Sequence, residues 1–366
     1  MLRESLVVLL TAAGLAVAAP SYADEGSEPT LHLVTLRGPG TTGHRGDTPD
    51  ALVAARMRTE QDAVLATVDA PTPVYRWTSA LNGFAVSLSE EQHDALAADP
   101  RVALVEDNAV RPLADVAAAP ATSATRPQRQ RGNGGAGTVI GFVDTGIDPA
   151  SPAFAVGPRL GPEPRSFVGT CTDAPEDPSW SAADCSAKIA AAASFVEGFG
   201  VDALRSAAVL SPRDTDGHGT QVASIAAGTA DTPVRSGPHR LGRFSGVAPD
   251  ARIAVYKACW SAPDPEDDGC ATADLVAAID RATAAGVDVL NLAVGGPSGT
   301  IDTVERALLG ATEAGVVVTA AAGNDGADAY AAHPAPWVIT VGAATSPLPT
   351  GAVLTRQGPR LTGAMA

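Results

Sequence analysis

The chain has 366 residues, of which 45% are hydrophobic and only 4% aromatic, and its formal net charge at pH 7 is -16. This length is enough for two domains, and the low aromatic content predicts cores built mostly of Ala, Val and Leu. A strongly acidic surface is repelled by nucleic acid and by anionic membranes, so the composition argues against both as partners.

The N-terminus has the pattern of a secretory signal. Arg3 gives a weak positive start, Leu6 to Ala19 is an apolar run, and Ser21-Tyr22-Ala23 places small residues at the cleavage positions. We therefore predict a signal peptide over residues 1–23, a secreted protein, and no membrane association after signal removal. A buried core helix is the alternative, whereas a membrane anchor is disfavoured because the run is too short to span.

Residues 24–110 show strand and helix patterns in the order β-α-β-β-α-β, which is typical of a ferredoxin-like α+β unit. A capping box, Ser89-Glu90-Glu91-Gln92, opens the second helix. Residues 111–137 are rich in Ala, Pro, Arg and Gly, which predicts a solvated, cleavable linker. The predicted strands of the unit are Leu31–Leu36, Pro73–Trp77, Gly83–Leu88 and Val102–Glu106, and its first helix is Asp50–Thr67.

From Thr138 onward strands and helices alternate, which implies a parallel sheet with helices on both faces. We assign residues 138–366 to this α/β domain, in which chemistry should collect beyond the carboxyl ends of the strands. The predicted strands are Val139–Val143, Arg252–Ala258, Val287–Ala293, Val316–Ala321 and Val338–Val341, and helices follow His218 and cover Thr272–Ala285 and Asp302–Ala314.

One segment imitates a nucleotide-binding motif. Gly132-Asn133-Gly134-Gly135-Ala136-Gly137 has the spacing G-x-G-x-x-G. A dinucleotide fingerprint must follow a strand and open a helix, but this segment precedes a strand. A flexible approach to that strand is the better interpretation, and no cofactor is expected.

Four cysteines fit an oxidising compartment. Cys171, Cys185, Cys259 and Cys270 allow three pairings, among which the sequence does not decide, although we favour the short loops Cys171–Cys185 and Cys259–Cys270. A zinc site is the alternative, but it needs more closely spaced pairs, so no metal is expected.

Three polar residues stand where strands end or a helix begins. Asp144 follows the first strand of the α/β domain, His218 lies in Asp-Gly-His-Gly-Thr before an Ala-rich helix, and Asn324 follows the strand that ends at Ala321. Each of them alone is more typical of a turn or a helix cap. Their combination in one α/β domain is much more specific.

With these motifs the chain resembles the subtilisin-like serine proteases, which carry a catalytic Asp, a catalytic His and an oxyanion Asn in this order. The resemblance covers roughly Thr138 to Ala344. The cysteine neighbourhoods and Asp288 to Gly296 are similar to the plant-type branch, and Leu31 to Val110 resembles the inhibitory propeptide of the family. The resemblance implies a secreted endopeptidase precursor with a protein or peptide substrate and with its own propeptide in the cleft.

The resemblance also implies a role for each site residue. Asp144 would orient His218, His218 would take the proton of a serine hydroxyl, and Asn324 would stabilise the oxyanion. Ala293-Val294-Gly295 would pair with the substrate backbone, and Ala321-Ala322-Gly323 would form a wall of the first specificity pocket.

The sequence also departs from the family pattern. Gln221 replaces a second histidine, Ala293 a common serine, and Ala327 a usual proline. No Gly-Thr-Ser elbow follows Asn324, so we expect a peptidase domain that stops before its nucleophile and a chain without activity of its own. The alternative is a catalytically dead binding or protease-inhibitory module that acts through Leu31 to Val110.

Overall fold

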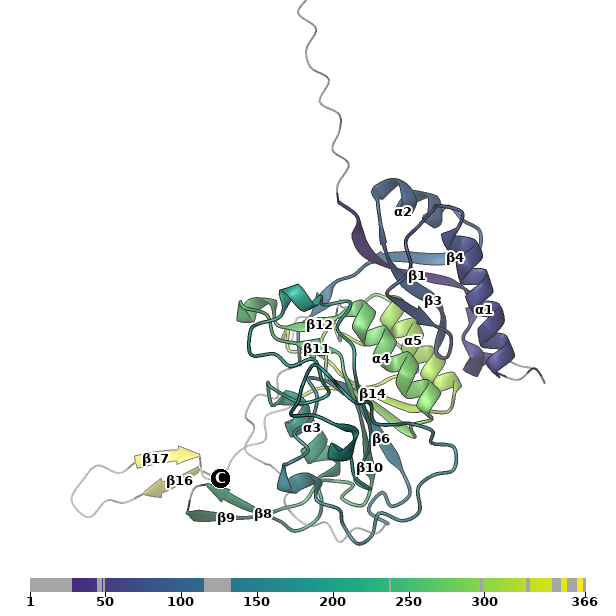
Figure 1. Ribbon diagram of the computed structural model, residues 1–366. Coiled ribbons are helices and arrows are strands. Elements are labelled where there is room, and N and C mark those ends of the chain that lie inside the picture. Colours follow the sequence, from purple (N-terminus) through teal and green to yellow (C-terminus); the bar gives the residue numbers. More distant parts are fainter. Residues whose placement is uncertain are drawn as a thin grey trace, which may run out of the picture.

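The structure, a computed structural model, shows a small unit stacked on a larger one (Figure 1). The predicted signal peptide and most of the predicted linker lie outside the described residues. Among the residues that are described, no helix is long and apolar enough to cross a membrane. The described residues are 28–44, 48, 50–114, 133–236, 238–296, 299–326, 330–343, 350–353 and 361–364.

The small unit is a four-stranded antiparallel sheet in the order β2-β3-β1-β4. Successive side chains of its strands point to opposite faces of the sheet. Val34, Phe84 and Val86 pack against the two helices of the unit, whereas Leu33 and Ala85 face the larger unit. The capping box predicted at Ser89 is present. The elements are β1 (Thr30–Pro39), α1 (Asp50–Leu65), β2 (Tyr75–Trp77), β3 (Leu81–Leu88), α2 (Glu90–Ala97) and β4 (Val102–Asp107).

The larger unit is built on a six-stranded sheet in the order β15-β14-β13-β6-β10-β7, in which every pairing is parallel. The predicted fold class, a parallel sheet with helices on both faces preceded by a small α+β unit, is confirmed. The strands are β6 (Val139–Asp144), β7 (Ile189–Ser194), β10 (Arg252–Lys257), β13 (Val289–Leu292), β14 (Val317–Ala321) and β15 (Ile339–Val341), and the helices are α3 (His218–Ala227), α4 (Thr272–Ala285) and α5 (Thr303–Glu313).

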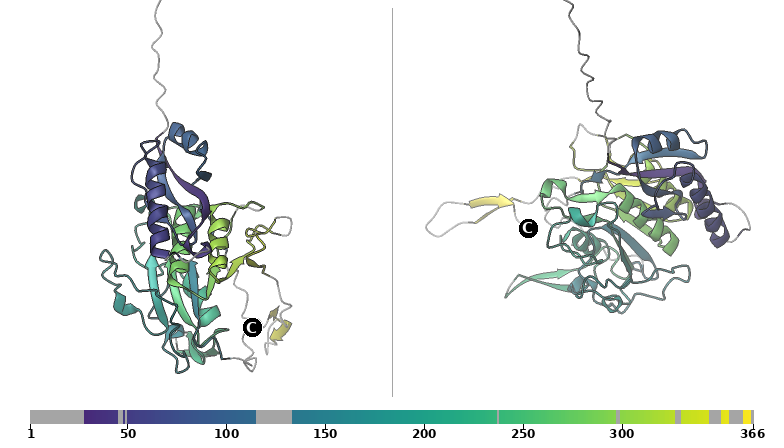
Figure 2. Two further views of the ribbon diagram at one scale, coloured as in Figure 1. Left: turned by 90° about the vertical axis from the view of Figure 1, so that its right-hand side faces the viewer. Right: turned by 45° about the horizontal axis from the view of Figure 1, so that its top comes forward.

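The two faces of this sheet are covered differently. Helices α4 and α5 lie on one face and pack with the small unit into one continuous core (Figures 1 and 2). Helix α3 packs on the other face, where Ala223 and Ala227 meet Phe142 and Val255. The exposed side chains of β14 and β15 include Val317, Ile339 and Val341.

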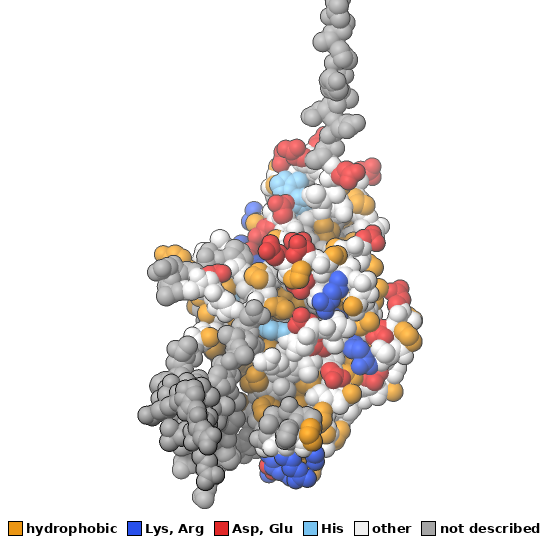
Figure 3. All heavy atoms as spheres, turned by 90° about the vertical axis from the view of Figure 1, so that its left-hand side faces the viewer, with side chains coloured by type: hydrophobic (Ala, Val, Ile, Leu, Met, Phe, Trp, Pro, Cys, Tyr) orange, Lys and Arg blue, Asp and Glu red, His pale blue; other side chains and the backbone are white. Residues whose placement is uncertain are grey.

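Smaller strands surround this core. Strand β5 (Val110–Arg111) joins the sheet β11-β12-β5 with β11 (Cys259–Trp260) and β12 (Gly269–Ala271). Two hairpins are formed by β8 (Thr232–Ser236) with β9 (His239–Phe244) and by β16 (Thr350–Val353) with β17 (Leu361–Ala364). Acidic side chains are prominent over the small unit on the face seen in Figure 3, in keeping with the negative net charge.

Carboxylates connect the small unit to α4 and α5. Asp280 Oδ1 on α4 accepts hydrogen bonds from the backbone N–H groups of Ser79 and Ala80, each at 2.8 Å. Burial raises the pKa of Asp280 to about 6, although these N–H groups oppose the rise. In the opposite direction, Glu106 of the small unit accepts from the N–H of Thr303 at the first turn of α5, at 2.8 Å. An anionic group is favourable there because the helix dipole is positive at its N-terminus.

Candidate active site

Asp144 and His218 meet at the carboxyl end of the central sheet. Asp144 is the last residue of β6 and His218 the first residue of α3. The imidazole Nδ1–H donates to Asp144 Oδ1 at 2.7 Å, and both side chains are buried. The structure therefore brings together the first two residues that the sequence singled out.

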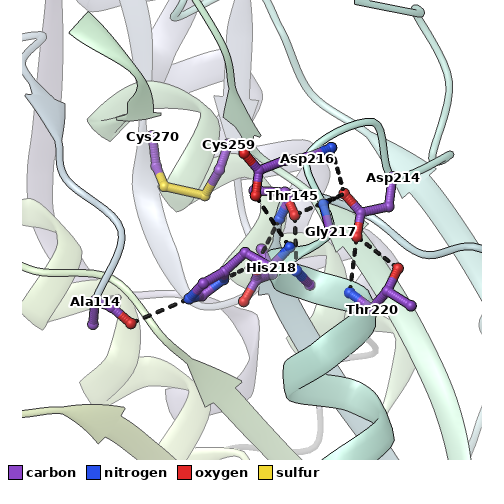
Figure 4. A network of polar contacts seen from close by, with 11 residues as sticks. Ala114, Thr145, Asp214, Asp216, Gly217, His218, Thr220, Cys259 and Cys270 are labelled. Carbon is purple, nitrogen blue, oxygen red and sulfur yellow. Dashed lines mark hydrogen bonds and ion pairs between the residues drawn. A yellow bond between two sulfur atoms is a disulfide. The ribbon is translucent and has the colours of Figure 1, made fainter. Parts of the chain in front are cut away.

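A polar network, shown in Figure 4, fixes the loop that carries the histidine. Asp214 Oδ2 accepts from the N–H and the hydroxyl of Thr220, at 2.9 and 2.6 Å, and Asp214 Oδ1 accepts from the Thr145 hydroxyl at 3.0 Å. The Thr145 hydroxyl in turn accepts from the N–H of Gly219 at 2.8 Å. These contacts join the loop after β6 to the first turn of α3.

Two glycines allow this loop to approach the carboxylate. Gly217 has φ +112°, in the left-handed region that side chains disfavour. At Gly219, a Cβ atom would lie 2.4 Å from the carbonyl oxygen of Gly146 and 3.1 Å from Asp144 Oδ1. A side chain at position 219 would therefore push α3 away from Asp144.

The protonation of His218 follows from its surroundings. Burial alone would lower the pKa of the imidazole, but the hydrogen bond and the charge of Asp144 and the carbonyl of Ala114 outweigh it and raise the pKa to about 9. At neutral pH both ring nitrogens thus carry protons, which matches an acceptor at each nitrogen: Asp144 Oδ1 at Nδ1, and Ala114 O at Nε2, 3.1 Å away.

Residues 110–114 pair with the larger unit as an added strand. The N–H of Ala114 donates to Ala293 O at 3.0 Å, the N–H of Gly295 donates to Pro112 O at 2.8 Å, and Leu113 forms an antiparallel bridge with Val294. On its other side, β5 pairs antiparallel with β12. The segment is thus held between β12 and the residues Ala293-Val294-Gly295, which the sequence analysis assigned to substrate binding.

This arrangement differs from the solvated linker predicted from residue 111 onward. Arg111 and Ala114 are buried, at 5% and 8% exposure. The Ala, Pro and Arg composition of the segment misled the prediction because the partners of these residues lie more than 100 positions away in the sequence. Of the predicted linker, the structure describes residues 111–114 and 133–137.

Asn324 and the predicted pocket wall lie at the same edge of the sheet as Asp144. Asn324 follows β14 by three residues, and the carboxyl ends of parallel strands share one edge. The wall Ala321-Ala322-Gly323 is half-buried. It is held by Ala322, whose N–H donates to Val341 O at 2.8 Å and whose carbonyl accepts from the N–H of Ala332 at 3.0 Å.

A buried pair that the sequence analysis missed contacts Val294, within the segment predicted to bind substrate. His333 Nε2 contacts Val294 O at 3.0 Å, and His333 Nδ1 contacts Glu305 Oε1 at 2.5 Å. Both side chains are almost fully buried. A histidine in a loop and a glutamate inside a helix give no joint signal in the sequence, because only the fold brings them together.

The cysteines form the two short-loop disulfides that the sequence analysis favoured, Cys171–Cys185 and Cys259–Cys270. The second disulfide joins β11 to β12 and therefore braces the strand that pairs with β5. Within the described part of the chain, no group of three or more His, Cys, Asp or Glu is placed to hold a metal ion.

Comparisons with known proteins agree with this geometry. The family model of the subtilase family matches residues 135–366, and that of peptidase inhibitor I9 matches residues 39–114. Subtilisin-like protease SBT1.4 of Arabidopsis thaliana is 35% identical over 286 residues, which are 75% of this chain and 36% of the relative. Subtilisin-like protease SBT2.5 of the same plant is 39% identical over 292 residues, 74% of this chain and 34% of the relative.

The chain thus spans about a third of the length of these curated relatives. Among solved structures, fervidolysin from Fervidobacterium pennivorans, a keratinolytic enzyme related to subtilisin, matches with a TM-score of 0.47 and 18% identity, over 86% of this chain and 42% of that chain.

Proposed function

The chain belongs to the subtilase family, and from this premise we propose that it serves serine-type hydrolysis of peptide bonds. In this proposal His218 is the general base and general acid, Asp144 orients His218, and Asn324 is an oxyanion donor. We further propose that residues 24–114 are its inhibitory propeptide, behind a signal peptide over residues 1–23 for secretion, and that residues 138–366 belong to the peptidase domain. No cofactor or metal is part of this proposal.

The observation that carries the proposal is the position of the Ala114 carbonyl. It contacts His218 Nε2 at 3.1 Å while the residues before it pair with 293–295 and with β12. This strand brings a peptide carbonyl group beside the imidazole, next to the position where a serine would react. For acyl transfer the Ala114 oxygen would turn from Nε2 to the oxyanion donor, and the serine oxygen would take its place at Nε2. We infer that the bond between Ala114 and Asp115 is the maturation site.

The residues of this chain support a specific sequence of proton movements. Departure of residues 111–114 removes the Ala114 carbonyl, which favours the proton on Nε2. A serine hydroxyl that reaches the unprotonated Nε2 would then give its proton to the ring while its oxygen attacks the substrate carbonyl, and Asp144 would stabilise the resulting imidazolium. The side-chain amide of Asn324 would donate to the oxyanion. In subtilisin, a relative, loss of one such donor costs about 2.7–4 kcal/mol of transition-state stabilisation. The imidazolium would then protonate the leaving amine.

A second candidate function is inhibition of other proteases. The small unit has its own core between its sheet and its helices, with Val34, Phe84 and Leu96 almost fully buried. Its last residues already occupy a subtilase cleft. A unit of this kind, acting through residues 31–114, could occupy the clefts of related enzymes without any catalysis by this chain.

The coding sequence after the Ala366 codon distinguishes the two candidates. Because no Gly-Thr-Ser elbow follows Asn324, we expect neither peptide hydrolysis nor labelling by a serine-directed phosphonate from the 366-residue chain. If an in-frame elbow follows, the longer product should hydrolyse peptides, and His218→Ala should abolish this. A stop codon at that point, together with inhibition of other subtilases, would support the second candidate. Labelling of a serine in the 366-residue chain would refute the expectation that none of its serines is the nucleophile.

A further inference from the structure

Arg111 is a buried cation in the segment that occupies the cleft. It lies three residues before Ala114, and its guanidinium Nη2 donates to Asp302 Oδ2. The side chains of Arg111 and Asp302 are only 6% and 12% exposed. A charge removed from water to this extent is unfavourable unless it is paired, so the carboxylate is what makes this position acceptable to an arginine.

The larger unit holds Asp302 in place without help from the propeptide. Asp302 is the N-cap of α5, and its Oδ1 accepts from the N–H of Glu305 at 3.0 Å. This bond leaves Oδ2 directed at the guanidinium. The carboxylate will therefore remain at the same position, with an acceptor to satisfy, after residues 111–114 have left.

The surroundings of the pair suit a planar, forked cation. A Cβ atom at Gly296 would lie 2.9 Å from Arg111 Nη1, so the absence of a side chain there leaves space for the guanidinium. A cavity of about 360 Å³ adjoins the pair, and among the residues that line it from the larger unit are Thr272, Gly296 and Thr303. Arginine presents its donors in a fixed fork, whereas lysine offers a single ammonium on a flexible stem.

The proposal rests on the function proposed above: we propose that Asp302 makes the cleft selective for polypeptides with an arginine at the fourth residue on the N-terminal side of the scissile bond. Counted back from Ala114, that residue is Arg111. A substrate with an apolar side chain there would bury the Asp302 carboxylate without a cation. A buried charged group that loses its partner is more unfavourable than an exposed one, so the discrimination should be at least tenfold, which is about 1.4 kcal/mol.

The test is a binding experiment, so it does not depend on catalysis. In the full chain, Arg111→Glu places a second carboxylate against Asp302 and should displace residues 111–114 from the cleft. Fluorescence anisotropy then measures the affinity of this variant for two labelled peptides with free C-termini, Arg-Pro-Leu-Ala and Met-Pro-Leu-Ala. We expect the arginine peptide to bind at least tenfold more tightly.

The matched control adds Asp302→Asn, which keeps an N-cap side chain for α5 but removes the charge. In the double variant the two peptides should bind equally. If both peptides bind Arg111→Glu with the same affinity, the cleft assignment stands and the arginine selectivity is refuted. Amide exchange shows whether residues 111–114 have left the cleft. If they have left and neither peptide binds, both the proposal that these residues occupy the substrate site and the proposed arginine selectivity are refuted.

Discussion

The pKa of His218 should depend on the charge of Asp144. Asp144→Asn keeps the shape of the side chain but removes the anion 2.7 Å from Nδ1. The raised pKa of about 9, against an ordinary value of 6.5, corresponds to about 3 kcal/mol of preference for the charged ring, at about 1.4 kcal/mol per pKa unit. Without the anion, burial dominates, and we expect the pKa of His218 to fall below 6.5.

The assay is an NMR titration of the histidine rings in chain labelled with ¹⁵N-histidine. His218→Gln identifies the resonance among the six histidines of the sequence. Asp216→Asn is the matched control, because the charge of Asp216 also raises the pKa of His218 but has a smaller effect than that of Asp144. A pKa that stays near 9 in Asp144→Asn would refute the argument that Asp144 determines the charge of the ring.

The same shift predicts how the stability of the chain depends on pH. The pKa of His218 is higher in the folded chain than the ordinary value, so its stabilisation is fully present below pH 6.5 and is lost as the pH rises through about 9. Chemical unfolding at several pH values should show a decrease of the unfolding free energy over this interval. The decrease should be absent in Asp144→Asn, and its persistence there would assign it to another group.

Three further substitutions test other parts of the structure. Gly310→Ala would place a Cβ 1.7 Å from the carbonyl oxygen of Ala80. Amide exchange in the loop at Ser79 and Ala80, which contacts α4 and α5, should therefore accelerate at least tenfold, although alanine favours the helix itself. Unchanged exchange would contradict this close contact. Thr220→Val removes a hydroxyl from the loop of the histidine and should lower the unfolding free energy by about 1–3 kcal/mol, whereas Thr220→Ser should not. Replacing Cys259 and Cys270 together by serine removes a disulfide between residues 11 positions apart and should lower the free energy of unfolding by about 3 kcal/mol in denaturant titrations. An unchanged midpoint would show that the disulfide adds no stability.

The sequence predicted well those features that are local. Alternating apolar residues located β1, a short apolar run located β6, and the Ser89 capping box located the start of α2. Glycines on both sides of His218, and the carboxylate of Asp144 directly after a buried strand, indicated two residues that the structure brings into contact. These signals were sufficient because each structural cause lies within a few residues of its effect.

Contacts between distant segments were not predictable in the same way. Arg111 and Asp302 are separated by 191 positions, and His333 and Val294 by 39. The composition around Arg111 indicated a linker, because no neighbouring residue shows that its guanidinium packs against Gly296 and pairs with Asp302. The supporting hydroxyls of Thr145 and Thr220 are equally ordinary in the sequence, because their importance comes from the atoms that they join.

The strand that fills the cleft has a consequence for how the chain behaves at low concentration. Occupant and cleft belong to one polypeptide, so dilution into a large external volume does not separate them, and the cleft stays blocked however few molecules are present. Once the backbone between residues 114 and 133 is cut, the same contacts become an encounter between two molecules. Exposure of the cleft would then depend on how far the fragments diffuse apart.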